Sequence, residues 1–213
     1  MTSATSQPPT DGTGAPDGPR RTRAEALRGA VAGGVALGAA ALAGAWTRPA
    51  ATIGRPTPTQ DARILNFLLV VEETQAGFYE AALRSGALRG ELLEFARVVA
   101  PQERDHVALL RRRLGRRAAA PPRLDFGDAI TDAPRFRAAA IDLEEQAAAA
   151  YIGQGASLTA AAMQDAARIV AVEARHAAWI RDLAGEDPAP RPADPASPAA
   201  DVLSHLRQKG FLR

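Results

Sequence analysis

The sequence predicts an all-α fold, a four-helix bundle in which a long crossover joins the second helix to the third. Alanine is abundant and aromatic residues make up only 5% of the 213 residues, a composition that favours closely packed helices over a sheet. Four segments repeat apolar residues at helical spacing, and they span residues 60–85, 90–114, 132–152 and 158–184. The connection between the second and third segments is long for a turn, but its length suits a crossover along a bundle.

The chain begins with residues 1–45, which we expect to lie outside the folded domain. The first part is rich in Ser, Thr, Pro, Gly and Asp, a composition typical of disordered segments. Two arginines at positions 20 and 21 precede an uncharged Gly/Ala-rich apolar stretch at 29–45, which ends in the cleavage-like pattern Ala43-Gly44-Ala45. These features predict a signal peptide that directs export to the cell envelope or the extracellular space.

The arginine pair resembles a twin-arginine export signal, although the large apolar residues that usually follow such a pair are missing. The export route, twin-arginine or Sec, therefore stays open. If the stretch at 29–45 is not cleaved, it becomes a membrane anchor, because its length is close to the lower limit for spanning a bilayer. Membrane association through this stretch is the alternative to a cleaved signal.

The folded domain is expected to span residues 59–185, after a Thr/Pro/Ala-rich linker at 46–58. Its first helix is predicted to end at Gly86, since glycine readily takes the left-handed conformation of a helix C-cap. The second helix contains Pro101, which removes a backbone hydrogen bond and is expected to bend the helix.

The third helix is predicted to begin after Asp132, which can act as its N-cap, and to end before a short turn at 153–155. The fourth helix follows this turn, and Gly185 closes it. The remaining residues, 186–213, form a Pro/Ala-rich tail. Within the tail we expect one short amphipathic helix, at about 200–211, that lies on the bundle.

Two Glu-x-x-His motifs lie on the predicted helices, Glu103 with His106 and Glu173 with His176. Residues three positions apart on a helix project from the same face, and in both motifs the rest of that face is apolar. Each motif therefore points a carboxylate and an imidazole into the core. A buried carboxylate needs a counter-charge, because it would otherwise cost several kcal/mol or take up a proton.

The other two helices each place one glutamate on an otherwise apolar face, Glu72 in the first and Glu144 in the third. A tyrosine follows each glutamate by seven positions, and Tyr79 and Tyr151 are the only two tyrosines in the chain. Seven residues make two helical turns, so each tyrosine lies on the face of its glutamate. We expect the tyrosines to hydrogen-bond to the buried polar cluster, and the alternative is that they are ordinary core residues.

The two halves of the domain thus repeat one arrangement. The lone glutamate precedes the Glu-x-x-His motif by 31 residues in the first half and by 29 in the second. Together the halves outline a dinuclear metal site with six ligands, Glu72, Glu103, His106, Glu144, Glu173 and His176. Two divalent ions would balance the four carboxylates. We expect Glu103 and Glu173 to bridge the ions, and each ion to take one histidine and one further glutamate.

Composition excludes several other classes of site. The chain has no cysteine, which removes disulfides, iron–sulfur clusters, thiolate zinc sites and cysteine nucleophiles, and leaves carboxylate and imidazole as the strong metal ligands. The 26 basic and 24 acidic residues give a net charge of +2, which does not suggest a nucleic-acid partner.

Other charged residues near the motifs have simpler interpretations. Helical phase alone does not exclude Glu73 and Glu145 as metal ligands. The matching spacing to a tyrosine favours Glu72 and Glu144 as the ligands instead. Asp105 could orient a histidine, although a solvated position is expected because it points off the apolar face. The arginine-rich segment at 111–117 is expected to be a solvated helix end rather than a phosphate site, and His205 a surface residue.

The ligand pattern resembles the ferritin-like dimetal carboxylate superfamily, in which a glutamate from each of two helices joins a Glu-x-x-His from two others. The closer resemblance is to the ferritin-like domain of exported bacterial and desiccation-related proteins, and it covers roughly residues 61–183. It rests on Leu-Asn-Phe-Leu-Leu-Val-Val-Glu at 65–72 with Phe78-Tyr79, on Leu143-Glu144 with Ala-Tyr-Ile-Gly at 150–153, and on Glu-Ala-Arg-His-Ala-Ala at 173–178. Gln75 and Gly77 depart from it, because members often carry acidic residues there, and this alters the surroundings of Glu72 without removing a ligand.

The resemblance implies iron, while the ligand chemistry suits iron or manganese and also admits zinc. With Fe(II), the expected activity is reduction of O2 or peroxide, as in a ferroxidase, with no catalytic residue beyond the metal ligands. The alternative is a structural or stress-protection bundle in which metal is absent or only stabilising. Iron storage would need a hollow cage, and the sequence shows no fifth bundle helix of the usual kind.

Overall fold

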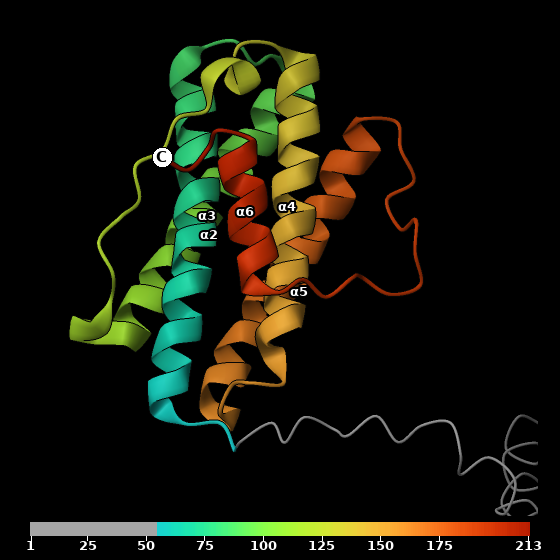
Figure 1. Cartoon of the computed structure of the whole chain (residues 1–213). Helices are drawn as coiled ribbons and strands as arrows, with labels where there is room; N and C mark the ends of the chain where they lie inside the picture. The colour runs from blue at the N-terminus through green and yellow to red at the C-terminus, as the bar shows by residue number, and fades with distance from the viewer. Residues whose placement is uncertain (1–54) are drawn as a thin grey trace, which may run out of the picture. The chain divides into compact units, whose positions relative to one another are not determined.

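A computed structural model describes residues 55–213, and in this part of the chain it contains five α-helices and no β-strand. The helices are α2 (Pro58–Ser85), α3 (Gly90–Leu114), α4 (Ala133–Gly155), α5 (Ala160–Leu183) and α6 (Ala199–Gln208). The predicted all-α fold is thereby confirmed, and the four longest helices form the bundle (Figure 1). Every helix in these residues is too short or too polar to span a bilayer. The predicted signal or anchor at 29–45 lies outside the described residues.

The bundle consists of two helical hairpins. α2 and α3 form the first hairpin through the loop at 86–89, and α4 and α5 form the second through the loop at 156–159. The residues between the hairpins run along the bundle, so that α3 and α4 point in the same direction (Figure 1). This connection is the predicted crossover, and it includes two short 3-10 helices, η1 (Gly115–Arg117) and η2 (Gly127–Ile130).

Capping residues explain the ends of the first hairpin. α2 begins at Pro58, two residues before the predicted start, because the Thr57 hydroxyl accepts a hydrogen bond from the backbone N–H of Gln60 (3.2 Å). The helix ends at Gly86, whose φ of 66° is the left-handed conformation expected of a glycine C-cap. α3 has the predicted bounds, and Pro101 lies within it.

The second hairpin differs from the prediction at the end of α4. This helix begins after its N-cap Asp132, as predicted, but it continues to Gly155 through the residues that were expected to form a turn. Gly153 has another use there. A Cβ atom at Gly153 would lie 2.1 Å from the carbonyl oxygen of Ser197, so the missing side chain lets the tail cross α4 in close contact.

α5 begins two residues later than predicted, at Ala160, because Thr159 is its N-cap. The buried carboxylate of Asp61, near the start of α2, accepts hydrogen bonds from both the backbone N–H (2.9 Å) and the hydroxyl (2.6 Å) of Thr159. This contact ties the first turn of α2 to the first turn of α5. It therefore helps to set the relative position of two helices from different hairpins.

The tail returns to the bundle and ends in α6, which lies between α2 and α4 in Figure 1. α6 ends at Gln208, three residues before the predicted end. His205 is half-buried rather than free on the surface, because its Nε2 lies 2.8 Å from a carboxylate oxygen of Asp142 on α4. The backbone N–H of Arg213 donates to the carbonyl of Arg123 (3.1 Å), so the end of the chain is fastened to the crossover.

Aromatic side chains join the crossover and the tail to the bundle core. Phe78 of α2 stacks on Phe136 of α4 with the ring centroids 5.3 Å apart. Phe126 of the crossover and Phe211 of the tail pack against Phe78 at 5.5 and 6.2 Å. Tyr79 also contacts Phe78, at 5.3 Å, and its hydroxyl reaches the polar cluster described next. The aromatic core is therefore in direct contact with that cluster.

Candidate metal centre

Six polar residues meet inside the bundle, and they are the six that the sequence analysis selected as ligands. The exposed fraction is 0% for Glu72, Glu103, Glu144 and Glu173, 7% for His106 and 4% for His176. α2 and α4 each supply one glutamate, whereas α3 and α5 each supply a glutamate and a histidine. All four helices thus contribute to one enclosed cluster.

The cluster divides into two overlapping sets whose potential ligand atoms all lie within 4.8 Å of one another. The first set is Glu72, Glu103, His106 and Glu173, and the second is Glu103, Glu144, Glu173 and His176. Glu103 and Glu173 belong to both sets. These are the two residues to which the sequence analysis assigns the bridging role.

His106 turns its Nδ1 toward three carboxylates. The Nδ1 atom lies 2.9 Å from Oε1 of Glu173, 3.2 Å from Oε2 of Glu72 and 3.4 Å from Oε2 of Glu103. Two of these glutamates come from helices other than its own. The imidazole thus lies where its own nitrogen and carboxylate oxygens from three helices converge.

His176 takes the matching position in the other set. Its Nδ1 lies 3.0 Å from Oε1 of Glu103 and 3.4 Å from Oε2 of Glu144. Its other ring nitrogen, Nε2, lies 2.8 Å from the side-chain oxygen of Gln102 on α3. Since that amide oxygen only accepts hydrogen bonds, the contact keeps the proton on Nε2 and leaves Nδ1 as the ligand atom. Gln102 is not identifiable from the sequence, because its contact crosses between helices.

Several buried atoms of the cluster lie close to another polar atom but make no hydrogen bond of good geometry within residues 55–213. They are both carboxylate oxygens of Glu103, Oε1 of Glu173 and Nδ1 of His176. Buried polar atoms in proteins are normally paired, so unpaired acceptors that converge on one point fit a cation held between them. Carboxylate oxygen and imidazole nitrogen are also the donors that divalent metals prefer. The cluster is therefore compatible with a metal site.

Burial and mutual repulsion change the protonation of the cluster when no metal is bound. Burial, with the charge of Glu103, raises the pKa of Glu72 to about 7, and burial with the charge of Glu72 raises that of Glu173 to about 8. Burial alone would lower the pKa of both histidines. Contacts with the carboxylates outweigh it and raise the pKa of His106 to about 12 and that of His176 to about 10. In the metal-free protein, protons bound to the glutamates and histidines thus offset the negative charge that metal ions would otherwise neutralise.

The two tyrosines connect the halves of the bundle. Tyr79 of α2 donates its hydroxyl hydrogen to Oε1 of Glu144 on α4, and Tyr151 of α4 donates to Oε1 of Glu72 on α2 (2.5 Å). Burial raises the pKa of both phenols well above the usual value, so they stay protonated and act as donors. Each tyrosine therefore contacts the lone glutamate of the opposite hairpin.

Gln75 also crosses between the halves. Its side-chain nitrogen donates to Oε2 of Glu144 (3.1 Å) and to Oε2 of Glu173 (2.9 Å). The sequence indicates that Gln75 alters the surroundings of Glu72, and it indicates no contact of Gln75 with the second hairpin. Gln75 follows Glu72 by three positions and so lies on the same helix face, which indicates that its amide is buried, but the sequence does not identify the partners of the amide.

The two flanking glutamates point away from the cluster. Glu73 forms an ion pair with Arg111 of α3, and Glu145 forms one with Arg181 of α5 (2.7 Å). These pairs remove both glutamates from the candidate ligands, and they show that Arg111 serves an internal ion pair. Asp105 is exposed, as expected.

A four-helix bundle with a long crossover, whose core gathers glutamates and histidines from all four helices, defines the ferritin-like class of all-α proteins. Comparison with protein families gives the same result, since residues 60–186 match the ferritin-like domain. The match covers more than half of the chain, and the protein therefore belongs to the ferritin-like domain family. A search among curated proteins found no match.

Proposed function

We propose that the protein binds two metal ions, iron in the first instance, inside the bundle. One observation carries the proposal: the two four-residue ligand sets share Glu103 and Glu173. Two ions bound there would be joined by two carboxylates, and each would keep one histidine and one lone glutamate of its own. The unpaired oxygens of Glu103 support this interpretation, because a bridging carboxylate needs both oxygens free for metal.

Charge and ligand type support divalent ions. The four glutamates carry four negative charges when ionised, and two divalent ions would neutralise them with both histidines uncharged. A set rich in oxygen with one imidazole for each ion suits iron or manganese, whereas zinc could compete by affinity.

The proposed activity is oxidation of Fe(II) with O2 or peroxide as the acceptor. Iron held by the six residues would supply one electron per Fe(II), and two such electrons with two protons would convert O2 to hydrogen peroxide, or hydrogen peroxide to two waters. The residues of the chain would bind the two ions and orient the ligand side chains. Burial of the cluster keeps bulk water away, Tyr79 and Tyr151 hold the two lone glutamates, and Gln102 fixes the proton on Nε2 of His176.

Anaerobic loading tests the metal site and its chemistry in one experiment. The metal-free protein is loaded with Fe(II), desalted, and exposed to O2 while the ferric absorbance and O2 consumption are followed. We expect about two irons per chain and an oxygen-dependent ferric band. His176→Ala should retain about one iron and lose most of the band, because one ligand set loses its imidazole. His205→Ala is the matched control, since His205 is the only histidine outside the cluster.

The result also separates the enzyme from a structural bundle. Two tightly bound irons without catalytic O2 consumption would assign the metal a structural role. Protein that retains no iron, and whose melting temperature is unchanged by metal, would contradict the proposal for the site itself. Loss of iron in His205→Ala as well would show that the histidine effect is not specific to the cluster.

We also propose that the protein is exported. The arginine pair at 20–21 and the apolar stretch at 29–45 support this proposal, since together they have the order of a signal peptide. Cell fractionation with N-terminal sequencing tests it. A mature protein that begins just after Ala45 is the expected result, full-length protein in the membrane fraction would indicate an anchor, and uncleaved cytoplasmic protein would contradict export.

A further inference from the structure

A second feature of the molecule lies on the outer face of the first hairpin. A groove of about 570 Å³ runs between α2, α3 and the crossover. It is lined by small or apolar residues of the two helices, Ala76, Gly77, Val107 and Ala108, and by crossover residues, Pro121, Pro122 and Leu124. Glu73 and Arg111 line it as well. The groove thus combines apolar residues with one ion pair, whose glutamate is buried and whose arginine is half-buried.

The ion pair in this groove is incomplete. Oε1 of Glu73 pairs with Arg111, but Oε2 is buried and has no hydrogen-bond partner among the residues that the structure describes. The other cation lining the groove, Arg104, pairs with Glu80 instead (3.3 Å). A buried carboxylate oxygen without a donor is unfavourable, so a donor brought by a ligand would stabilise the groove.

The internal repeat supplies a second copy of this groove, on the outer face of the other hairpin. Both grooves are lined by the residues that follow the glutamate of the Glu-x-x-His motif by one, four, five and eight positions. In the first groove these are Arg104, Val107, Ala108 and Arg111, and in the second they are Ala174, Ala177, Ala178 and Arg181. Glu73 and Glu145 also correspond, since each follows its lone glutamate directly. The two grooves therefore have equivalent helical walls.

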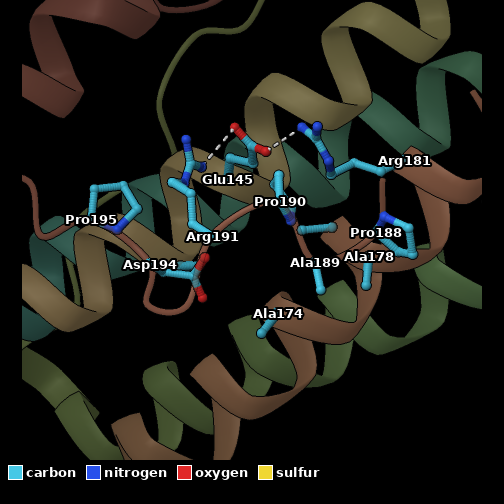
Figure 2. A pocket seen from close by; sticks show the side chains of 12 residues that line it. Glu145, Ala174, Ala178, Arg181, Pro188, Ala189, Pro190, Arg191, Asp194 and Pro195 are labelled. Atoms are coloured by element: carbon cyan, nitrogen blue, oxygen red, sulfur yellow. Dashed lines mark hydrogen bonds and ion pairs between the residues drawn. The ribbon is translucent and has the colours of Figure 1, made fainter. Parts of the chain in front are cut away.

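In the second copy a segment of the tail covers the helical wall and brings an arginine to it. The tail segment at 188–195 lines the space that remains, which is about 250 Å³ (Figure 2). Glu145 lies between two arginines there: Oε1 is 2.7 Å from Arg181, and Oε2 is 3.7 Å from Arg191 of the tail. Pro190 lies beside Arg191, whereas Pro188 lies nearer to Arg181, and the two prolines form the apolar part of the segment (Figure 2).

We propose that the open groove between α2, α3 and the crossover binds an extended, proline-containing segment of a partner protein that carries an arginine. The arginine takes the place that Arg191 has in the other groove and forms an ion pair with the Glu73 carboxylate beside Arg111, while the prolines lie along the apolar residues of the groove. An arginine fits because its planar guanidinium pairs well with a carboxylate that already holds one guanidinium. The proposal is independent of metal binding and of the proposed activity.

A synthetic peptide tests the proposal directly. The probe is acetyl-Pro-Ala-Pro-Arg-Pro-Ala-amide, which copies residues 188–193, titrated into the full-length protein and followed by calorimetry and by NMR of the backbone amides. We expect one peptide per chain, with the largest NMR shifts at Gly77, Ala108 and Leu124. Replacing the peptide arginine by alanine should weaken binding about tenfold or more, since a charge-assisted contact is lost.

Two protein variants and one control locate the contact. Glu73→Gln should weaken binding about tenfold or more, whereas Glu91→Gln, at an exposed glutamate of α3 outside the groove, should leave it unchanged. Ala108→Phe fills the groove without touching the ion pair and should also abolish binding, which keeps the test valid if Glu73→Gln unfolds. No binding to the unaltered protein would overturn the proposal. Equal binding to Glu73→Gln, or loss of binding only in Glu145→Gln, would overturn it too.

Discussion

The two hairpins supply the same cluster residues from matching positions, but they differ in the amides around them. Each hairpin provides a lone glutamate, a tyrosine and a Glu-x-x-His motif. Only the first hairpin adds Gln75 and Gln102, whose counterparts in the second are Ala147 and Val172. Both amides reach across to residues of the second hairpin. The repeat therefore retains the charged positions and varies the neutral hydrogen bonds.

This difference makes the two ligand sets chemically unequal. Glu144 accepts hydrogen bonds from both Tyr79 and Gln75, whereas Glu72 accepts one from Tyr151 and is close to His106. Each lone glutamate thus has one tyrosine donor and one nearby histidine, and the second set differs by the additional neutral donor Gln75. Neutral donors hold a carboxylate in place whatever its protonation, while a charged contact depends on pH.

The largest expected effect comes from breaking the shared part of the cluster. Glu173→Gln removes a ligand from both sets, so we expect the metal content to fall from about two ions per chain to well below one. Glu72→Gln affects one set, and about one ion should remain. Metal analysis after anaerobic loading measures both. In the metal-free protein either change should raise the melting temperature, because it removes one of four repelling carboxylates, and a lower value would contradict the predicted repulsion.

Removing the metal should reverse the pH dependence of stability. The pKa of Glu72 is about 7 and that of Glu173 about 8 in the folded chain, against 4.5 ordinarily, so between these values the folded state holds more protons than the unfolded state. The free energy of unfolding of the metal-free protein should therefore fall as the pH rises from about 4.5 through 8. The histidines act in the same direction above 6.5, their ordinary pKa, because their pKa is raised as well.

Bound metal displaces these protons, so stabilisation by metal should grow with pH over the same range. Melting temperatures of metal-free and Mn(II)-loaded protein between pH 5 and pH 8 check both statements. A metal-free protein that is more stable at pH 8 than at pH 5 would show that the cluster does not hold protons in the folded state.

The two glycines beside the crossover and the tail should differ in their tolerance of a side chain. A Cβ at Gly153 would meet the backbone oxygen of Ser197 at 2.1 Å, whereas a Cβ at Gly77 would meet the side chain of Leu124 at 2.6 Å. A leucine side chain can change its rotamer, whereas a backbone oxygen cannot move without shifting the chain. Gly153→Ala should therefore lower the free energy of unfolding by about 3 kcal/mol, and Gly77→Ala by about 1 kcal/mol. Urea unfolding of the metal-free variants measures both, and equal effects would contradict the assigned contacts.

The smallest expected effects concern the amides that distinguish the halves. Gln75→Ala removes the donor of Glu173 and one of the two donors of Glu144 and should cost about 2 kcal/mol, while Gln102→Ala, at a half-buried position, should cost about 1 kcal/mol. The same urea experiment applies. Ala147→Gln, at the counterpart of Gln75, is the matched control that tests whether the second hairpin accepts an amide there; a stabilised protein would show that the asymmetry is not required.

Much of the fold follows from local sequence. The helix spans were predictable within a few residues, because apolar spacing and caps such as Asp132 and Gly86 act within one or two turns. The end of α4 was not predictable, because glycines favour a turn locally while the tail that crosses Gly153 comes from distant sequence. The same holds for His205, whose partner Asp142 is brought near only by the packing of α6.

The sequence by itself determined which side chains enter the core, since helical periodicity places Glu72, Glu144 and the two Glu-x-x-His motifs on apolar faces. It could not determine which of these groups touch. Tyr79 contacts Glu144, and Gln75 and Gln102 contact ligand residues of the opposite hairpin. These contacts depend on how the four helices pack. Periodicity describes one helix at a time, whereas contacts between helices are set by their distance, angle and register, and only the tertiary structure decides these.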